Sequence, residues 1–417
     1  MNKKIMSLLT VLLLFVLVAC RSTNSKQTSV LSEPVATSAP IEDTFVIELI
    51  FGNERVTETI VFNEEETTLF NVIDVVFDIT YDESNFGPMI TSIKTKDGDF
   101  TLESQDGAFI AIYINDEQAL TGVHEIIVAK DQTYSFVFEW YDQSKQISFI
   151  IDQFIDHHLT NYIHDDSIDM NIVVLLAHLG LLDDYLTLND VLEYFIELDT
   201  NNVSELYKAM VIISAFNGDM TNVHGLNLVE KLISINDTSK YSAPYALIGL
   251  NTGVHDEDIS NYESALIESM TTTNKPSKDV GLDMSGITLA ALSPYKNDEA
   301  VKAVIDEYIA FLEDTINEFG GIRDEHWDMN ENASSISQVI IGLIAVDVNE
   351  SSDLLTRDNS LITRLLDYAN VDGSFNWTLD DDRADLAFST PQAVLALTLY
   401  QKYSETNEPV IFYKFSE

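Results

Sequence analysis

The sequence predicts an α+β protein with two folded domains: a small sheet domain, then an all-α ring of six inner and six outer helices, an α6/α6 toroid. Alternating β-branched and aromatic runs fill residues 44–142, whereas residues 146–404 show helical periodicity. In the second part, nearly apolar segments alternate with amphipathic ones, as expected for inner and outer helices. The length of 417 residues also exceeds the roughly 250 to 300 residues that one core serves.

Residues 1–19 have the form of a secretory signal. Two lysines precede an apolar run that ends at Ala19, and this run is shorter than the roughly 20 residues of a spanning helix. Its end, Leu-Val-Ala followed by Cys20, resembles a bacterial lipobox, in which the signal is removed before an acylated cysteine. The resemblance implies that a lipid on Cys20 anchors the protein at the extracytoplasmic face of the cell membrane.

Residues 20–43 are rich in Ser, Thr, Pro and Ala and contain few large apolar side chains. Such a composition is typical of a linker. We expect a flexible stalk between the membrane and the first domain.

The chain is strongly acidic, with 22 Lys and Arg against 69 Asp and Glu and a formal net charge of -47. Nucleic acids and anionic lipid surfaces are therefore expected to be poor partners, because both repel such a surface. Three explanations of the acidity remain open: solubility, adaptation to salt, and capture of a cationic ligand or divalent metals.

Cys20 is the only cysteine. If its thiol carries lipid, the folded domains contain no disulfide, no cysteine nucleophile and no thiolate ligand for zinc.

The sheet domain is predicted to contain two strands, one helix and at least three further strands. The helix is indicated by threonine caps before apolar residues at helical spacing. The strands are expected at 44–52, 54–63, 89–95, 107–116 and 124–140, and the helix at 67–77.

The helix segment TLFNVIDVV and the stretch from Ile112 to Asn115, followed by Gly122, carry a resemblance to a known domain. Residues 44–142 resemble the β-grasp-like domain at the C-terminus of transcobalamin and intrinsic factor, which also occurs in bacterial surface proteins. The resemblance implies a β-grasp-like fold.

The helical part contains repeated apolar segments, each of which opens with a small or capping residue. These inner segments begin at Asp169, Ser204, Tyr241, Asp283, Ala333 and Phe388. The amphipathic outer segments lie at 147–159, 188–197, 225–233, 261–270, 298–316 and 359–369, and residues 405–417 follow as a C-terminal tail.

Two local motifs, NEFGGIRD at 317–324 and NVDGSFNW at 370–377, precede inner segments. They resemble the repeats of terpenoid cyclase and prenyltransferase α/α toroids. The resemblance implies the ring fold but no particular chemistry, because this fold serves enzymes and carriers alike.

The catalytic motifs of these enzymes are absent from the sequence. There is no Asp-x-Asp-Asp acid, no Cys-Gly-Glu-Gln thioester and no cysteine in the body for a prenyltransferase zinc site. Two Asp-Asp-x-x-Asp matches, at 165–169 and 381–385, are expected to be solvated helix starts rather than diphosphate sites. The eight histidines show no metal-ligand spacing. We therefore expect neither a catalytic residue nor a metal ligand.

Transcobalamin and intrinsic factor carry the same two modules in reverse order and hold cobalamin between them. The resemblance implies a non-catalytic lipoprotein that binds a ligand, cobalamin or another corrinoid-like molecule, between its domains, with a transporter as a further partner. The residues expected at the ligand are aromatic and polar side chains of the sheet-domain hairpin and the ring mouth: Tyr113, Asn115, Tyr241, Tyr245, Asp283, Trp327, Trp377 and Asp385.

Two other functions remain open. The first is a surface adhesion or scaffold protein that binds envelope glycans or proteins. The second is a degenerate cyclase-like enzyme that brings distant carboxylates together. A deep ring mouth favours a small ligand, whereas a filled ring favours a scaffold.

Overall fold

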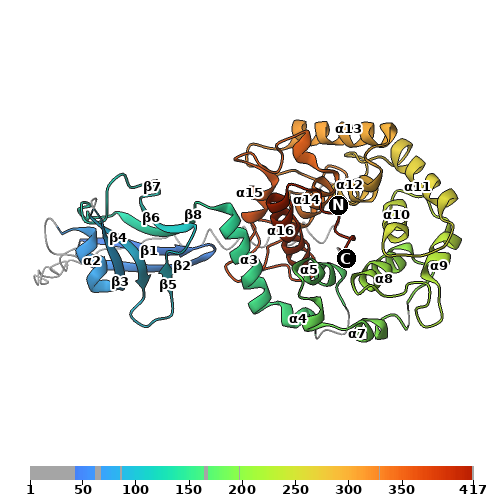
Figure 1. Cartoon of the computed structure of the whole chain (residues 1–417). Helices are drawn as coiled ribbons and strands as arrows, with labels where there is room; N and C mark the ends of the chain where they lie inside the picture. Colours follow the sequence, from blue (N-terminus) through green and yellow to red (C-terminus); the bar gives the residue numbers. More distant parts are fainter. Residues whose placement is uncertain are drawn as a thin grey trace, which may run out of the picture. The chain divides into compact units, whose positions relative to one another are not determined.

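The computed structural model describes residues 43–61, 67–84, 87–163, 168–196, 198–327 and 329–415. The predicted signal, Cys20 and residues 20–42 of the predicted stalk lie outside this range. The described part consists of a sheet domain from Thr44 onward and a helical ring from Gln143 onward (Figure 1).

The sheet domain is built on a five-stranded sheet, as far as the described residues show, with strand order β2-β1-β8-β6-β7. β1 pairs in parallel with β8, and the other neighbours are antiparallel. A second sheet has the order β3-β4-β5. In chain order the elements are β1 (Thr44–Phe51), β2 (Glu54–Val61), α2 (Leu69–Val76), β3 (Asp78–Ser84), β4 (Gly87–Lys94), β5 (Thr101–Glu103), β6 (Ala108–Ile114), β7 (Glu117–Gln118) and β8 (Thr133–Trp140).

The alternation in β1 explains how this domain forms its core. Phe45, Ile47 and Leu49 are buried, and the residues between them are only partly covered. Side chains of a strand point alternately to opposite faces, so one face of β1 packs inward. Thr68 caps α2 by accepting a hydrogen bond from the backbone N–H of Asn71, as its sequence predicts.

Strand β3 was absent from the predicted elements. Its sequence, DITYDES, is polar, and only one of its residues is even partly buried, so it shows no hydrophobic alternation. It is held by antiparallel pairing with β4. The predicted strand at 124–140 is also shorter than expected, because β8 begins at Thr133.

The helical domain is a ring of inner and outer helices, which confirms the predicted alternation (Figure 1). Within the described residues there are six helices of each kind, joined by loops and by the short helices α4 (Leu159–Ile163) and α6 (Leu182–Tyr185). The inner helices are α5 (Met170–Leu179), α8 (Val203–Ala215), α10 (Ala243–Asn251), α12 (Leu282–Leu292), α14 (Ala333–Val346) and α16 (Ser389–Thr406). The outer helices are α3 (Gln143–His157), α7 (Leu188–Glu193), α9 (Leu228–Ile235), α11 (Ser260–Thr272), α13 (Glu299–Thr315) and α15 (Leu361–Leu366).

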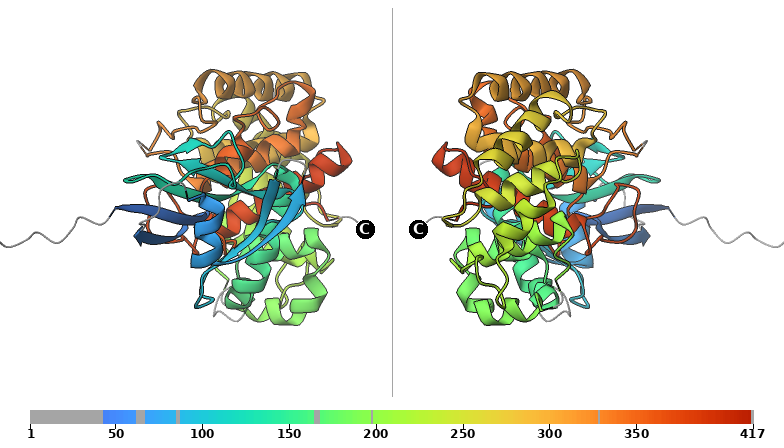
Figure 2. Two further views of the ribbon diagram at one scale, coloured as in Figure 1. Left: turned by 90° about the vertical axis from the view of Figure 1, so that its left-hand side faces the viewer. Right: turned by 90° about the vertical axis from the view of Figure 1, so that its right-hand side faces the viewer.

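Burial separates the two kinds of helix. All residues of α14 are buried, whereas α13 buries one stripe that includes Val301, Tyr308 and Leu312. In both views of Figure 2, α13 is the long orange helix along the outside of the ring. Each inner helix contacts the next one in the chain, and α16 contacts α5, so the inner ring closes on itself.

The segment after α16 belongs to the core of the ring. Phe412 is 2% exposed and Tyr413 is fully buried. The backbone carbonyl of Phe412 lies 2.9 Å from Nε2 of His178, and the carbonyl of Tyr413 accepts a hydrogen bond of 3.1 Å from Thr252. His178 and Thr252 lie at the ends of α5 and α10, so this segment crosses the mouth formed by the C-terminal ends of the inner helices.

No helix in the described part of the chain is both long enough and apolar enough to cross a membrane.

Candidate functional site

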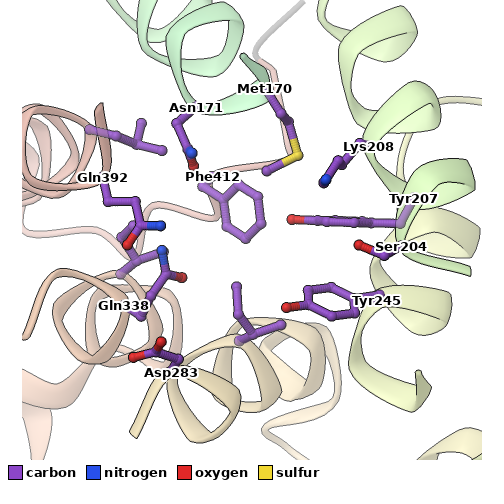
Figure 3. Close-up of a pocket in the computed structure, with 13 residues that line it drawn as sticks. Met170, Asn171, Ser204, Tyr207, Lys208, Tyr245, Asp283, Gln338, Gln392 and Phe412 are labelled. Carbon is purple, nitrogen blue, oxygen red and sulfur yellow. The ribbon is translucent and has the colours of Figure 1, made fainter. Parts of the chain in front are cut away.

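A cavity of about 180 Å³ lies inside the ring, and we call it the ring cavity. Every inner helix contributes to it from its first three turns, so the cavity lies toward the mouth at which these helices begin. Phe412 reaches it from the opposite side and forms its floor (Figure 3). Its polar lining is Asn171, Ser204, Tyr207, Lys208, Tyr245, Asp283, Gln338 and Gln392, and its apolar lining is Met170, Ile287, Ile341, Leu395 and Phe412.

Several polar atoms of the ring cavity have no hydrogen-bond partner within the described protein. These atoms are the hydroxyl oxygen of Tyr207 and the Oε1 atoms of Gln338 and Gln392. The side chains lie well inside the protein, since Tyr207 is 2% exposed and Gln338 is 8% exposed. An unsatisfied buried polar group costs about 1 to 3 kcal/mol, so a partner for these groups is worth a similar amount.

The two tyrosines form one side of the cavity. Their ring centroids are 4.9 Å apart with an interplanar angle of 31°. Figure 3 shows the hydroxyls of Tyr207 and Tyr245 pointing across the cavity, toward the side from which Gln338 and Gln392 project. The Tyr245 hydroxyl has only a weak contact, 3.7 Å long, with the sulfur of Met284.

Burial raises the pKa of both hydroxyls, and that of Tyr207 lies well above its ordinary value. Both tyrosines are therefore neutral hydrogen-bond donors at neutral pH.

Asp283 is the carboxylate of the cavity lining. Its pKa is raised, mainly by burial and further by the charge of Asp324, while a hydrogen bond from Ser335 acts in the opposite direction. The ammonium group of Lys208 forms an ion pair of 3.1 Å with Glu205, four tenths of whose side chain is exposed. Lys208 is therefore already paired, and the surroundings of Asp283 disfavour its charged form.

A second depression of about 310 Å³ adjoins the ring cavity and shares Asp283 and Gln392 with it. We call it the outer depression. Trp377, 41% exposed, and Phe388, 66% exposed, are its aromatic residues. The remaining lining residues are Met329, Asn332, Ser334, Ser335 and Asp385.

No protein-family model matches the sequence, and no curated protein matches it. A solved structure of a candidate metal-binding protein from Ruminococcus gnavus covers 24% of this chain and 100% of its own, with 13% identity and a TM-score of 0.21.

A family 76 glycoside hydrolase from a bovine Bacteroides thetaiotaomicron strain covers 88% of this chain and 99% of its own, with 10% identity and a TM-score of 0.44. Neither likeness is high enough to transfer residues or chemistry. The sheet domain and the ring are instead established by the strands and helices of this chain.

The structure brings four of the predicted site residues together. Tyr245 and Asp283 line the ring cavity, and Asp283, Trp377 and Asp385 line the outer depression. Asp385 has a local role: its carboxylate accepts hydrogen bonds from the backbone N–H and the hydroxyl of Ser389, at 3.0 and 2.8 Å, at the start of α16.

The other ring residues of the prediction lie outside both pockets. Trp327 packs beside Gly281 and is 55% exposed. Tyr241 is 44% exposed, and the ammonium nitrogen of Lys240 lies 4.8 Å from its ring centroid.

The two sheet-domain residues are occupied by local contacts. Tyr113 donates a hydrogen bond to Glu139. Asn115 has a φ of 50° in the turn between β6 and β7, and its side-chain oxygen accepts a hydrogen bond of 2.9 Å from the backbone of Thr133. A turn of this kind favours asparagine for conformational reasons, which explains its presence without a ligand.

Four residues of the cavity lining were not among those predicted from the sequence: Tyr207, Gln338, Gln392 and Phe412. The glutamines carried a usable signal, because each is a long polar side chain within an otherwise apolar or small-residue inner segment. Phe412 carried no such signal, since it lies in residues 405–417, which the sequence predicts to be a C-terminal tail.

The acidic motifs act at local turns and helix starts. Asp169 caps α5, accepting from the backbone N–H of Asn171 at 2.7 Å, and Asp381 accepts from the N–H of Thr378. Residues 164–167, which include His164 and the first two acids of the motif at 165–169, lie outside the described residues. Among the residues that are described, no group of three or more His, Cys, Asp or Glu side chains is placed to hold a metal ion.

Proposed function

We propose that this protein is a non-catalytic, extracytoplasmic binding lipoprotein that holds a small, uncharged, hydroxyl-rich ligand in the ring cavity. The observation that carries the proposal is the set of unpartnered groups on Tyr207, Gln338 and Gln392, which line one cavity from three inner helices. The anchoring follows from the lipobox-like sequence at Cys20.

Hydroxyl groups suit these atoms because one hydroxyl both donates and accepts a hydrogen bond. The Tyr207 hydroxyl supplies a donor, and the amides of Gln338 and Gln392 supply acceptors and donors whichever way they are turned. Ile287, Leu395 and other side chains add apolar surface to the same lining. A sugar or a related polyol combines polar edges with apolar faces in the same way.

The charge balance favours a neutral ligand. The net charge of -47 repels anions, and the cationic Lys208 is already paired with Glu205. The raised pKa of Asp283 means that its surroundings disfavour its charged form. The unpartnered atoms themselves belong to neutral groups.

The cavity size limits the ligand. Pockets for drug-sized ligands measure about 300 to 1,000 Å³, whereas the ring cavity measures about 180 Å³. A corrin macrocycle is too large for it, so the corrinoid implied by the resemblance is not the ligand we propose for this cavity. One sugar-sized ring is a better match.

The unpartnered polar groups of the cavity favour ligand binding over a purely structural role. A scaffold has no need for buried polar groups without partners, because each of them lowers stability. Binding also requires none of the catalytic motifs that are absent from the sequence. A transporter that receives the ligand would be a suitable partner.

The proposal is tested by isothermal titration calorimetry on the full-length chain in detergent, with hexoses, pentoses, N-acetylhexosamines, sugar alcohols and cobalamin as ligands. We expect at least one hydroxylated ligand to bind with a dissociation constant in the micromolar to millimolar range, and cobalamin not to compete with it. Tyr207→Phe removes one donor from the cavity and is expected to weaken binding about tenfold, the equivalent of about 1.4 kcal/mol.

Tyr308→Phe is the matched control, because Tyr308 is a buried tyrosine of outer helix α13 that does not line the ring cavity. It is expected to leave binding unchanged. The proposal fails if no hydroxylated ligand binds, or if the two variants weaken binding equally.

A further inference from the structure

We infer that the ring cavity is the innermost subsite of a longer groove, and that the ligand is the end of a short glycan chain. This inference rests on the proposed function and specifies its ligand class. The groove consists of the ring cavity and the outer depression, which meet at Asp283 and Gln392.

The two parts of the groove differ in chemistry. In the ring cavity, polar atoms lack partners. In the outer depression, apart from Gln392, which both parts share, polar groups are already engaged: the Asn332 side-chain oxygen accepts from the backbone of Ser335 at 2.9 Å, and the hydroxyls of Ser334 and Ser389 lie 3.0 Å apart. The outer depression therefore offers few hydrogen bonds that its own residues do not use.

Its free surface is aromatic instead. Phe388 and Trp377 expose 66% and 41% of their surfaces in the depression that shares Asp283 and Gln392 with the ring cavity. Covering apolar surface contributes about 25 cal/mol per Å², so these rings gain from a ligand with an apolar face. A second sugar unit, joined to the first and stacked on Trp377 or Phe388, uses this surface. The first unit is then held by hydrogen bonds and the second by stacking.

The floor of the cavity determines which part of a glycan enters. Phe412 and Tyr413, 2% and 0% exposed, close the far side of the ring, and the Tyr413 hydroxyl donates to the backbone carbonyl of Ala290. A chain therefore cannot pass through the ring, and only its end reaches Tyr207 and Gln338. Recognition is of chain termini rather than of internal units.

The test is calorimetry on the full-length chain with a series of one, two and three units of the best-binding sugar, taken from the malto-, cello-, manno- and chito-oligosaccharides. The disaccharide is expected to bind about tenfold more tightly than the monosaccharide, as aromatic stacking in addition to area burial predicts. Trp377→Ala is expected to remove this gain and to leave monosaccharide affinity within about twofold.

Trp327→Ala is the control, because Trp327 is an exposed tryptophan outside the outer depression. It is expected to change neither affinity. A cyclic oligosaccharide of the same sugar, which has no chain end, is expected not to compete.

The outcomes separate the two proposals. If the monosaccharide binds but the disaccharide binds no more tightly, or if the cyclic sugar competes, the inference about chain ends is overturned and the proposed function stands. If Trp377→Ala weakens the monosaccharide as much as the disaccharide, the division into subsites is wrong. If no sugar of any length binds, the proposed function itself fails.

Discussion

Gly286 of α12 lies directly against Gly342 of α14: a Cβ atom built on Gly342 would come within 2.4 Å of the Gly286 carbonyl oxygen. A Cβ on Gly286 would lie 2.1 Å from the carbonyl oxygen of Gln338. Both contacts are with backbone, which cannot turn aside as a flexible side chain does. The absence of side chains at these two positions allows α12 and α14 to pack closely, and this packing places Asp283 and Gln338 on the same cavity.

We predict that Gly286→Ala destabilises the protein. Alanine favours a helix interior by about 1 kcal/mol over glycine, but the clash with backbone in a packed core costs about 1 to 3 kcal/mol or more. Thermal unfolding measures the difference. Gly249→Ala in α10 is the matched control, because the new Cβ meets mainly the side-chain ends of Leu232 and Met210, at 3.0 and 3.3 Å. Equal melting temperatures for the two variants would contradict this prediction.

The unpartnered hydroxyl of Tyr207 predicts opposite effects on stability and on binding. Tyr207→Phe removes a buried polar group without a partner, so the ligand-free variant is expected to be as stable as the wild type, or more stable by about 1 kcal/mol. Urea unfolding with and without the bound sugar checks this. A clear loss of stability without ligand would show that the hydroxyl has a partner in the folded protein.

The raised pKa of Asp283 predicts a dependence of stability on pH. A carboxyl group whose pKa is higher in the folded state binds more protons there, so its contribution to stability falls as pH rises from its ordinary value, 3.8, through the folded-state pKa. Above the folded-state pKa, the stability lost through this carboxyl group no longer changes with pH. Asp283→Asn removes this loss and is expected to stabilise the protein at pH 7 but not at pH 4. Urea unfolding at intervals between these values measures the effect.

Asp142 provides the contrast for this experiment. Its pKa is lowered, first by a hydrogen bond from Ser144, so its contribution is present above 3.8 and is lost as pH falls through the folded-state pKa. Asp142→Asn is therefore expected to be destabilising at pH 7. The interpretation of Asp283 is wrong if Asp283→Asn, like Asp142→Asn, destabilises the protein at neutral pH.

Phe412 predicts a joint effect on stability and ligand affinity. Phe412→Ala removes a buried ring and is expected to cost about 3 to 5 kcal/mol, and opening the floor is expected to weaken binding. Thermal unfolding and calorimetry measure the two effects. Phe319→Ala, at a ring that is 61% exposed, is the control and is expected to change little.

Cys20 predicts the location of the protein. Metabolic labelling with a clickable fatty acid is expected to mark the wild type and not Cys20→Ala, and the variant is expected to leave the membrane fraction. Labelling of the variant would contradict acylation at this thiol.

The ring was predictable from the sequence because its signal is local. Inner segments such as Ala333–Val346 consist mainly of apolar and small residues, whereas outer segments such as Glu299–Thr315 are apolar on one face, and both patterns are visible within single helices. β3 lacked any such pattern, since pairing with β4 holds it rather than a buried face.

The site was less predictable because its residues come from separate helices and meet only in the folded ring. Tyr245 and Asp283 were selected as mouth residues, but Tyr207, Gln338 and Gln392 meet only when the ring closes. The exposed turn residue Asn115 and the exposed Tyr241 matched the same criteria of residue type without lying in a pocket. Residue type thus identified candidates, and the three-dimensional arrangement decided among them.

The position of Phe412 in the chain has a consequence for biosynthesis. It follows all six inner helices in the described sequence, so during translation the walls of the cavity emerge before its floor. Until the side chain of Phe412 is in place, the cavity is open at both ends of the ring of helices. If the cavity binds a ligand as proposed, newly made protein therefore acquires its affinity only after the last segment has packed against the folded helices.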